Sequence, residues 1–196
     1  MKVSQSQKLY EQMKEGRVYR REELTAFSKS LDRELKELVK DKRVTKAAAG
    51  LYYRPKMSRF GPLSPKSTDL VRAFLKTDDF LLTTLNVFNG LGVGLTQMVN
   101  EYVVYNRKRH GKFKLDGLTY YFKRPPNFPK KNEVSDEYLF VDLLNNYDEL
   151  PDPPDDLWDS LQAKVREFPH KKLERLSDRY GKASTKKLLK ELTANA

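Results

Sequence analysis

Three short segments near the N-terminus repeat hydrophobic residues with helical spacing. They are residues 4–14, 21–27 and 31–40. In the second segment Leu24 and Phe27 are expected to turn inward. In the third, Leu31, Leu35 and Leu38 follow one another at i, i+4 and i+7, which places them on a single apolar face. The pattern therefore predicts three helices, each with one buried side.

The second and third predicted helices are separated by only a few residues. Ser28-Lys29-Ser30 forms a tight turn between them, and Ser30 is a favourable N-cap for the third helix. Two short β-type segments then flank Gly50, at residues 44–49 and 51–54, and this arrangement predicts a hairpin. Helix, short helix, turn, helix and hairpin is the order of a winged helix-turn-helix. The third helix is then the recognition helix, which enters the major groove of DNA.

Polar and basic side chains cluster on the outward side of this predicted motif. The predicted DNA-binding residues are Ser28, Lys29, Ser30, Arg33, Lys36, Lys40, Arg43, Lys46 and Arg54. The first three stand where the N–H groups of a helix start favour phosphate. The last three belong to the predicted wing. The alternative left open is a small helical subdomain that packs against the rest of the chain.

The remainder of the chain mixes helical and extended patterns. Residues 58–67 are a connector interrupted by glycine and proline, and prolines interrupt the chain again after residues 124 and 150. The predicted elements are helices at 69–76, 136–145, 157–168, 171–180 and 185–192, a helical turn at 85–89, and strands at 80–84, 98–106, 112–115 and 118–123. Asp116-Gly117 joins the last two strands with the residues of a type I′ hairpin.

These patterns predict an α+β protein with three parts. Residues 1–57 are expected to be the winged helix-turn-helix domain, and residues 58–150 a mixed domain with a small antiparallel sheet. Residues 151–196 are expected to form a helical C-terminal extension.

The charge of the chain is unevenly distributed. The formal net charge is +11 over 196 residues. Residues 1–66 carry 17 Lys and Arg against 8 Asp and Glu, whereas residues 133–159 carry 10 acidic residues and no Lys or Arg. A strongly basic segment is typical of a surface that faces phosphate, so the charge supports nucleic-acid binding by the first part.

Several kinds of site are disfavoured by composition. The chain has no cysteine and two histidines, which argues against disulfides, thiol catalysis and transition-metal sites. No apolar run approaches the roughly 18 residues of a membrane span, and the N-terminus lacks the apolar stretch of a secretory signal. We therefore expect a cytoplasmic protein with no membrane association.

A metal-dependent nuclease is the natural enzymatic alternative, because carboxylates that hold Mg²⁺ are its main requirement. The Asp/Glu-x-Lys pattern occurs at Glu34-Leu35-Lys36, inside the predicted recognition helix, where a solvated pair of charges is the simpler interpretation. Asp142 stands on an apolar helix and is interpreted as a buried cap or salt-bridge partner. His110, in a basic loop, is interpreted as a surface residue. No catalytic residue, metal site or cofactor is therefore expected, and we expect no enzyme.

Several short motifs, taken in order, resemble one known family. They are Gly50-Leu51-Tyr52-Tyr53-Arg54-Pro55-Lys56, Ser58-Arg59-Phe60-Gly61-Pro62, Asn86-Val87-Phe88-Asn89-Gly90-Leu91-Gly92, Thr96-Gln97, Val103-Val104-Tyr105-Asn106 and Leu139-Phe140-Val141-Asp142-Leu143-Leu144. Together they are similar to the AbiEi-type antitoxins of type IV toxin–antitoxin systems and to related uncharacterised bacterial proteins. The resemblance covers about residues 1–150. Asn89 stands where the family usually has a histidine.

The resemblance implies a function and two partners. An N-terminal winged helix in this family binds double-stranded DNA at its own promoter and represses it. The C-terminal domain counters a nucleotidyltransferase-like toxin, usually without a stable complex. A homodimer on DNA is compatible with this interpretation, since winged-helix repressors commonly recognise two half-sites. The alternative is a protein-interaction module that counteracts a toxin without sequence-specific DNA binding.

Overall fold

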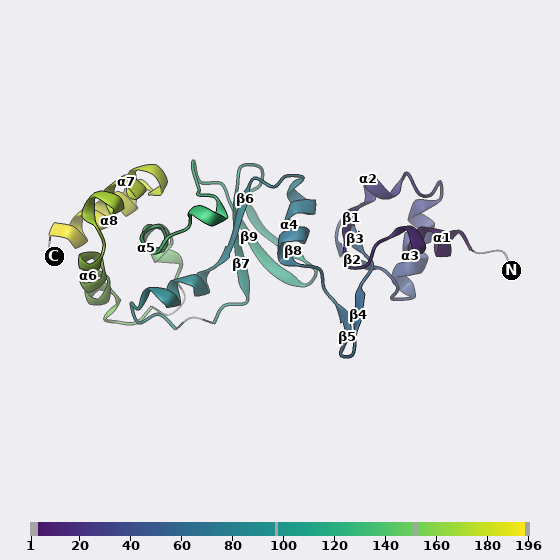
Figure 1. The fold of residues 1–196 in the computed structure, drawn as a ribbon, viewed down its shortest axis with the longest axis horizontal. Helices are drawn as coiled ribbons and strands as arrows, with labels where there is room; N and C mark the ends of the chain where they lie inside the picture. The colour runs from purple at the N-terminus through teal and green to yellow at the C-terminus, as the bar shows by residue number, and fades with distance from the viewer. Residues whose placement is uncertain (1–3, 97, 151–152, 195–196) are drawn as a thin grey trace. The chain divides into compact units, whose positions relative to one another are not determined.

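A computed structural model describes residues 4–96, 98–150 and 153–194, which form a mixed α+β protein with small antiparallel sheets and C-terminal helices (Figure 1). The chain divides into two compact units. The first comprises residues up to Asp78 together with Phe113–Thr119, and the second comprises Asp79–Lys112 together with the residues from Tyr120 onward. This division differs from the three predicted domains, because the helix after the connector belongs to the first unit and the C-terminal helices belong to the second.

The first unit begins with helices and strands in alternation. Its elements are α1 Gln5–Gln12, β1 Val18–Arg20, α2 Arg21–Leu24, α3 Leu31–Lys40, β2 Thr45–Ala48 and β3 Leu51–Tyr53. The three strands form an antiparallel sheet in the order β1-β3-β2, so that Tyr53 of β3 is paired with Val18 on one side and Thr45 on the other. The hairpin around Gly50 is confirmed, while β1 is not among the predicted strands.

The helices of this unit pack around a small core. The buried face of α3 is as predicted, and Leu31, Leu35 and Leu38 contact Leu9 and other core residues. Phe27, expected to face inward, is 44% exposed. The reason is that α2 ends at Leu24, so Phe27 lies beyond the helix and off its buried face.

Serine residues stand at the starts of α1 and α3, and one of the two caps its helix through its side chain. Ser4 is the N-cap of α1, where its Oγ accepts a hydrogen bond from the Gln7 N–H at 3.1 Å. Ser30 occupies the N-cap position of α3, but its side chain makes no capping hydrogen bond. Instead, the Ser28 hydroxyl accepts a hydrogen bond from the Ser30 N–H at 2.9 Å, which closes the turn before α3.

The predicted connector contains structure that its glycines and prolines did not reveal. A second hairpin, β4 Lys56–Ser58 and β5 Gly61–Leu63, precedes α4 Ser67–Leu75. The tip of a later hairpin also belongs to this unit. There the Asp116 N–H donates to the Ala47 carbonyl at 2.8 Å, and the Tyr53 hydroxyl donates to the Asp116 carboxylate at 3.0 Å.

A four-stranded sheet, in which β6 and β7 pair in antiparallel fashion, forms the strand layer of the second unit, apart from the hairpin tip. Its strands are β6 Phe80–Thr84, β7 Glu101–Asn106, β8 Gly111–Leu115 and β9 Leu118–Lys123, in the order β6-β7-β9-β8. The hairpin between β8 and β9 turns at Asp116 and Gly117, whose φ values of 48° and 80° are those that a type I′ turn requires. The predicted helical turn is the 3-10 helix η1 Leu85–Leu91.

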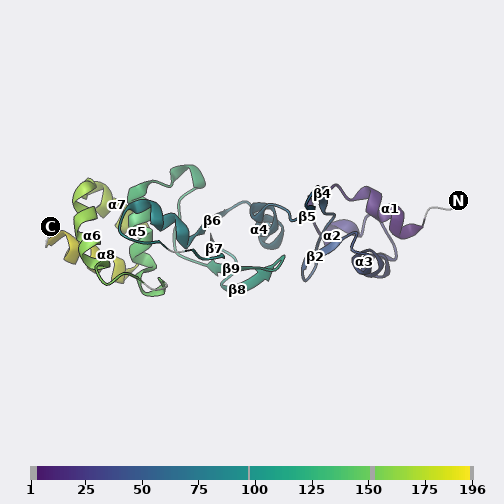
Figure 2. The ribbon, with the colours of Figure 1, turned by 90° about the horizontal axis from the view of Figure 1, so that it is seen from below.

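Four helices complete the second unit. They are α5 Asp136–Asn145, α6 Leu157–Glu167, α7 His170–Tyr180 and α8 Ala183–Ala194, with the 3-10 helices η2 Lys131–Glu133 and η3 Tyr147–Glu149 on either side of α5. Figure 2 shows α5 beside α6, α7 and α8, and all four share one core with η1. The C-terminal helices are therefore not a separate extension, because the apolar stripe Leu157, Leu161 and Val165 is buried with Phe140 of α5. No helix in the described part of the chain has the length and apolar character of a membrane span.

Candidate nucleic-acid interface

Three cations form a stripe along the exposed side of α3. Arg33, Lys36 and Lys40 follow at i, i+3 and i+7, so they stand above one another on the side opposite the buried leucines. All three are exposed, and among residues 4–96, 98–150 and 153–194 none of them has an ion-pair partner. This stripe is therefore available to an anionic ligand.

The acidic residues of α3 are held away from that stripe. Arg21, which begins α2, binds both oxygens of Asp32, with Nε–Oδ1 at 2.8 Å and Nη2–Oδ2 at 2.6 Å. This hydrogen-bonded contact lowers the pKa of Asp32. Glu37 accepts a hydrogen bond from the Ser6 hydroxyl at 2.9 Å. Each of these carboxylates is thus engaged at the edge of the exposed face, and the centre of that face stays positive.

Glu34 does not form the solvated charge pair that its neighbour Lys36 suggested. The side chain is buried, with Glu34 only 3% exposed, and Oε2 has no hydrogen-bond partner among the described residues. The prediction failed because Glu34 lies next to Leu31, Leu35 and Leu38 on the buried face, where helix geometry outweighs its polarity.

A surface hollow lies at the turn between α2 and α3. It has a volume of about 370 Å³ and brings together four of the predicted DNA-binding residues, Ser28, Lys29, Ser30 and Arg33. Arg21 also lines it, although the sequence pattern did not single out this residue. Its signal was its position at the start of α2, but the salt bridge to Asp32 depends on how the two helices pack.

The predicted wing cations fall into two groups. Lys46, on β2, is exposed. Arg43 and Arg54 instead pack against Tyr10 of α1, with guanidinium carbons 4.0 and 4.1 Å from the ring centroid.

Both arginines have further partners inside the unit. Arg43 donates to Gln7 Oε1 at 2.6 Å, and Arg54 donates to Glu15 Oε1 at 2.8 Å. These two side chains therefore fasten α1 to the sheet, and the exposed cations of α3 are the stronger candidates for phosphate contacts.

The second unit contains a polar cluster that sequence spacing could not reveal. Asp142 is buried, as expected, but its partner is the hydroxyl of Tyr105 rather than a cation, with O–O distances of 2.8 and 3.0 Å. Burial raises the pKa of Asp142 to about 6. His110 is exposed, as expected, and it lines a cavity together with Tyr105 and Asp142. In the part of the chain that the structure describes, no three His, Asp or Glu side chains are grouped to hold a metal ion.

Comparison with known proteins gives a likeness in fold. No family model and no curated protein matches the chain. The crystal structure of the RV2827C protein from Mycobacterium tuberculosis is similar, with a TM-score of 0.58 at 18% sequence identity. The alignment covers 91% of this chain and 71% of that chain. At this identity the likeness shows a shared fold, and function has to be argued from the residues.

Proposed function

We propose that the first unit is a winged helix-turn-helix that binds duplex DNA through α3. The observation that carries this proposal is the order α1-β1-α2-α3-β2-β3 together with the sheet order β1-β3-β2. In a winged helix-turn-helix the strand before the second helix joins the wing hairpin in one sheet, and the third helix is left with one free face. The unpaired stripe Arg33, Lys36 and Lys40 lies on that face.

The chemistry of the exposed face suits a nucleic acid. Lys and Arg side chains neutralise phosphates, and Arg or Lys also binds the acceptor edge of guanine in the major groove. Lys29 and the hydroxyls of Ser28 and Ser30 border the start of α3, where they suit the backbone on one side of the groove. Lys46 on β2 suits the backbone on the wing side.

The test is a salt series of duplex binding with the full chain. DNA containing the promoter region of its own gene is titrated between 50 and 200 mM salt, and affinity is expected to fall steeply because each neutralised phosphate releases counterions. The variant Arg33→Ala/Lys36→Ala is expected to lose roughly 1–3 kcal/mol per base-reading contact, or less if the side chains reach only phosphate. Its logarithmic salt slope is expected to decrease by about 2 if both side chains contact phosphate.

A charge-matched control is available on the second unit. Arg175 and Lys190 are exposed and have no ion-pair partner among the described residues, so Arg175→Ala/Lys190→Ala removes the same charges elsewhere. A flat salt response, or equal losses in the two double variants, contradicts the assignment of α3 as the DNA-binding helix.

The biological role that we propose is that of an autorepressing antitoxin. It rests on the ordered motifs shared with the AbiEi-type family, and it makes DNA at its own promoter one partner and a nucleotidyltransferase-like toxin the other. The second candidate is an interaction module that counteracts a toxin through its second unit and does not bind a specific DNA sequence.

A further inference from the structure

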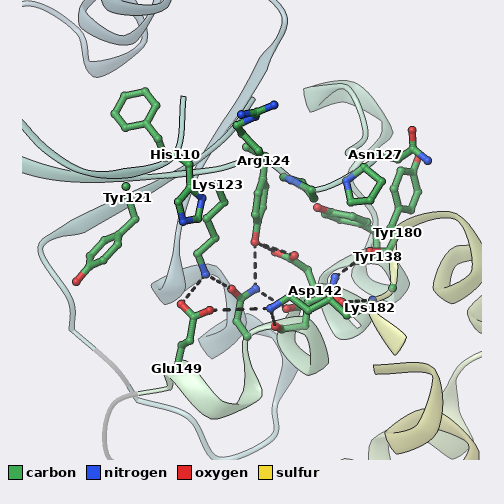
Figure 3. Close-up of a pocket in the computed structure, with 18 of the residues that line it drawn as sticks. His110, Tyr121, Lys123, Arg124, Asn127, Tyr138, Asp142, Glu149, Tyr180 and Lys182 are labelled. Atoms are coloured by element: carbon green, nitrogen blue, oxygen red, sulfur yellow. Dashed lines mark hydrogen bonds and ion pairs between the residues drawn. The ribbon is translucent and has the colours of Figure 1, made fainter. Parts of the chain in front are cut away.

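A cavity of about 730 Å³ lies within the second unit (Figure 3). Its walls come from β7, from β9 and the residues that follow it, from α5 and from the start of α8. The volume is in the range of small-molecule sites in proteins, which are commonly several hundred cubic ångströms and lined by aromatic groups with a few polar ones.

One part of the wall presents an acceptor. Tyr105 donates to Asp142, and Asn146 Nδ2 donates to the Tyr105 oxygen at 3.0 Å and to the Asp142 carbonyl at 2.6 Å. The single hydroxyl hydrogen of Tyr105 serves only one carboxylate oxygen at a time, so Asp142 keeps acceptor capacity toward the cavity. A buried carboxyl that retains this capacity favours a ligand with N–H donors.

Tyr138 of α5 supplies a hydroxyl without a partner. It lines the same cavity and is 3% exposed, yet no described residue forms a hydrogen bond with its hydroxyl. Its ring is fixed by an edge-to-face contact with Tyr180, at a centroid distance of 5.3 Å. The hydroxyl is not one of the fully buried unpaired atoms of the described residues, so it reaches the open space of the cavity. Here it is positioned to bind a polar group that enters the cavity.

A third part of the wall is basic. Lys123 Nζ lies 2.6 Å from Asn146 Oδ1 and 2.6 Å from Glu149 Oε2. Lys182, beside the start of α8, donates to the Asn145 carbonyl at 2.6 Å and lies 4.0 Å from the same Glu149. One glutamate thus faces two lysines. Counting all side chains of the lining, four Lys and Arg stand against two Asp and Glu, in addition to His110. The lining therefore favours an anion.

We propose that this cavity binds a mononucleotide, with the base toward Asp142 and Tyr138 and the phosphate toward Lys182 and Lys123. The three parts of the wall match the three chemical requirements of such a ligand. N–H groups of the base suit the carboxylate, and a base carbonyl suits the free hydroxyl. Tyr121 provides an aromatic ring for stacking, and phosphate suits lysine.

This proposal is independent of the DNA-binding role of the first unit, since every residue of the lining belongs to the second unit. Inorganic phosphate alone contacts only the basic part of the wall and leaves Tyr138 and Asp142 without a ligand group. A nucleoside has no phosphate, so it contacts only the part formed by Tyr138 and Asp142. Comparing the two fragments therefore separates the contribution of the lysines from that of Tyr138 and Asp142.

The experiment is isothermal titration calorimetry of the full chain with AMP, GMP, CMP and UMP, and with the matching nucleosides and inorganic phosphate. At least one mononucleotide is expected to bind with one site per chain and at least ten times more tightly than its nucleoside. Tyr138→Phe keeps the ring and removes the hydroxyl, and it is expected to weaken binding about five- to tenfold. Lys182→Gln is expected to weaken binding about tenfold and to leave nucleoside binding unchanged.

Two controls make the result specific to the cavity. Lys190→Gln removes an exposed lysine of α8 that does not line the cavity, and Arg33→Ala/Lys36→Ala removes two of the three cations of the α3 stripe. Both are expected to bind the mononucleotide as the parent protein does.

Three results overturn the proposal. They are the absence of binding of all four mononucleotides at 1 mM, equal affinity in Lys182→Gln and Lys190→Gln, and loss of binding in the α3 variant. Melting curves show whether Tyr138→Phe is folded, and the exposed position of Lys182 keeps the test decisive if it is not.

Discussion

The hydroxyl oxygen of Tyr105, on the central strand β7, lies 2.8 Å from Oδ1 of Asp142 on α5. This hydrogen bond joins the sheet of the second unit to the helix at its core, over a separation of 37 residues in the chain. Burial opposes the charged form of Asp142 and raises its pKa to about 6, while the hydrogen bond from Tyr105 and the nearby charge of Lys123 act in the opposite direction. The carboxyl group therefore titrates near neutral pH.

The free energy of unfolding should consequently depend on pH through the Asp142 carboxyl group. The pKa of Asp142 is about 6 in the folded protein against an ordinary value of 3.8 for an aspartate side chain, so the folded state binds the proton more strongly. The stability that protonation gives is fully present below pH 3.8, decreases as the pH rises above that value, and is lost once the pH has risen through about 6. Relative to Asp142→Asn, we expect the free energy of unfolding of the parent protein to fall by about 2 kcal/mol between pH 4.5 and 7.5.

The pH-dependent difference in the free energy of unfolding is measured by urea unfolding. The signal is the fluorescence of Trp158, the one tryptophan of the chain, which lies in the second unit. The Glu137 carboxylate, whose pKa is lowered to about 2 by Lys172, contributes equally to both proteins and cancels. Tyr105→Phe removes a hydrogen bond that lowers the pKa of Asp142, so its pH dependence should be steeper. A difference between parent and Asp142→Asn that does not change with pH contradicts the assignment.

Glu34 of α3 should be replaceable with a gain in stability. Its carboxylate is buried and Oε2 is without a partner among the described residues, and such a group costs more in desolvation than it returns. Glu34→Met, which is apolar and of similar length, is expected to raise the free energy of unfolding by about 1 kcal/mol. Thermal and urea unfolding followed by circular dichroism measure the change.

Glu37→Met is the matched control, because Glu37 lies on the same helix and has the Ser6 hydroxyl as its partner. It is expected to be neutral or destabilising. The exposed stripe is unchanged in Glu34→Met, so DNA affinity should also be unchanged. A destabilised Glu34→Met together with a neutral Glu37→Met would show that the buried carboxylate is stabilising.

The antitoxin proposal predicts that the two units have separate tasks in cells. Arg33→Ala/Lys36→Ala is expected to lose repression of a reporter driven by its own promoter, and still to neutralise a cognate nucleotidyltransferase-like toxin. The physical reason is that both side chains lie on the exposed face of α3 in the first unit and contribute nothing to the core of the second unit. Reporter activity and survival during toxin expression are measured in the same strains.

The outcome also distinguishes the two candidate functions. If the double variant keeps both activities, α3 has no part in DNA binding and the interaction-module interpretation is favoured. If a well-folded double variant loses both activities, the proposed separation of tasks is wrong.

The local sequence pattern was sufficient to predict those helices and hairpins whose conformation depends on their own residues. The apolar spacing of Leu31, Leu35 and Leu38 predicted α3 with the bounds that the structure has, and the apolar run of α5 likewise matched Asp136–Asn145. Asp116-Gly117 predicted its hairpin, because few residue pairs adopt positive φ at both positions. The exposed cations of α3 followed from the same spacing, as residues opposite the apolar face.

Contacts between distant segments were decided only by the tertiary structure. The strand β1 is three residues long and has too little periodicity to be recognised, and it exists because β3 offers it hydrogen-bond partners. The roles of Arg43 and Arg54 depend on where Tyr10 lies, and the burial of Glu34 depends on what covers α3.

The cavity of the second unit is the clearest example of an arrangement that only the tertiary structure decides. Tyr105 comes from β7, Tyr138 and Asp142 from α5, and Lys182 from the residue before α8, and no spacing in the chain relates these three segments. Sequence by itself determined which segments are helices and hairpins and which side of α3 is charged, since those properties depend on neighbours within a few residues. Only the packing of α5 against the sheet and α8 decided that these polar groups meet around one cavity, because burial and hydrogen-bond partners are properties of the folded chain.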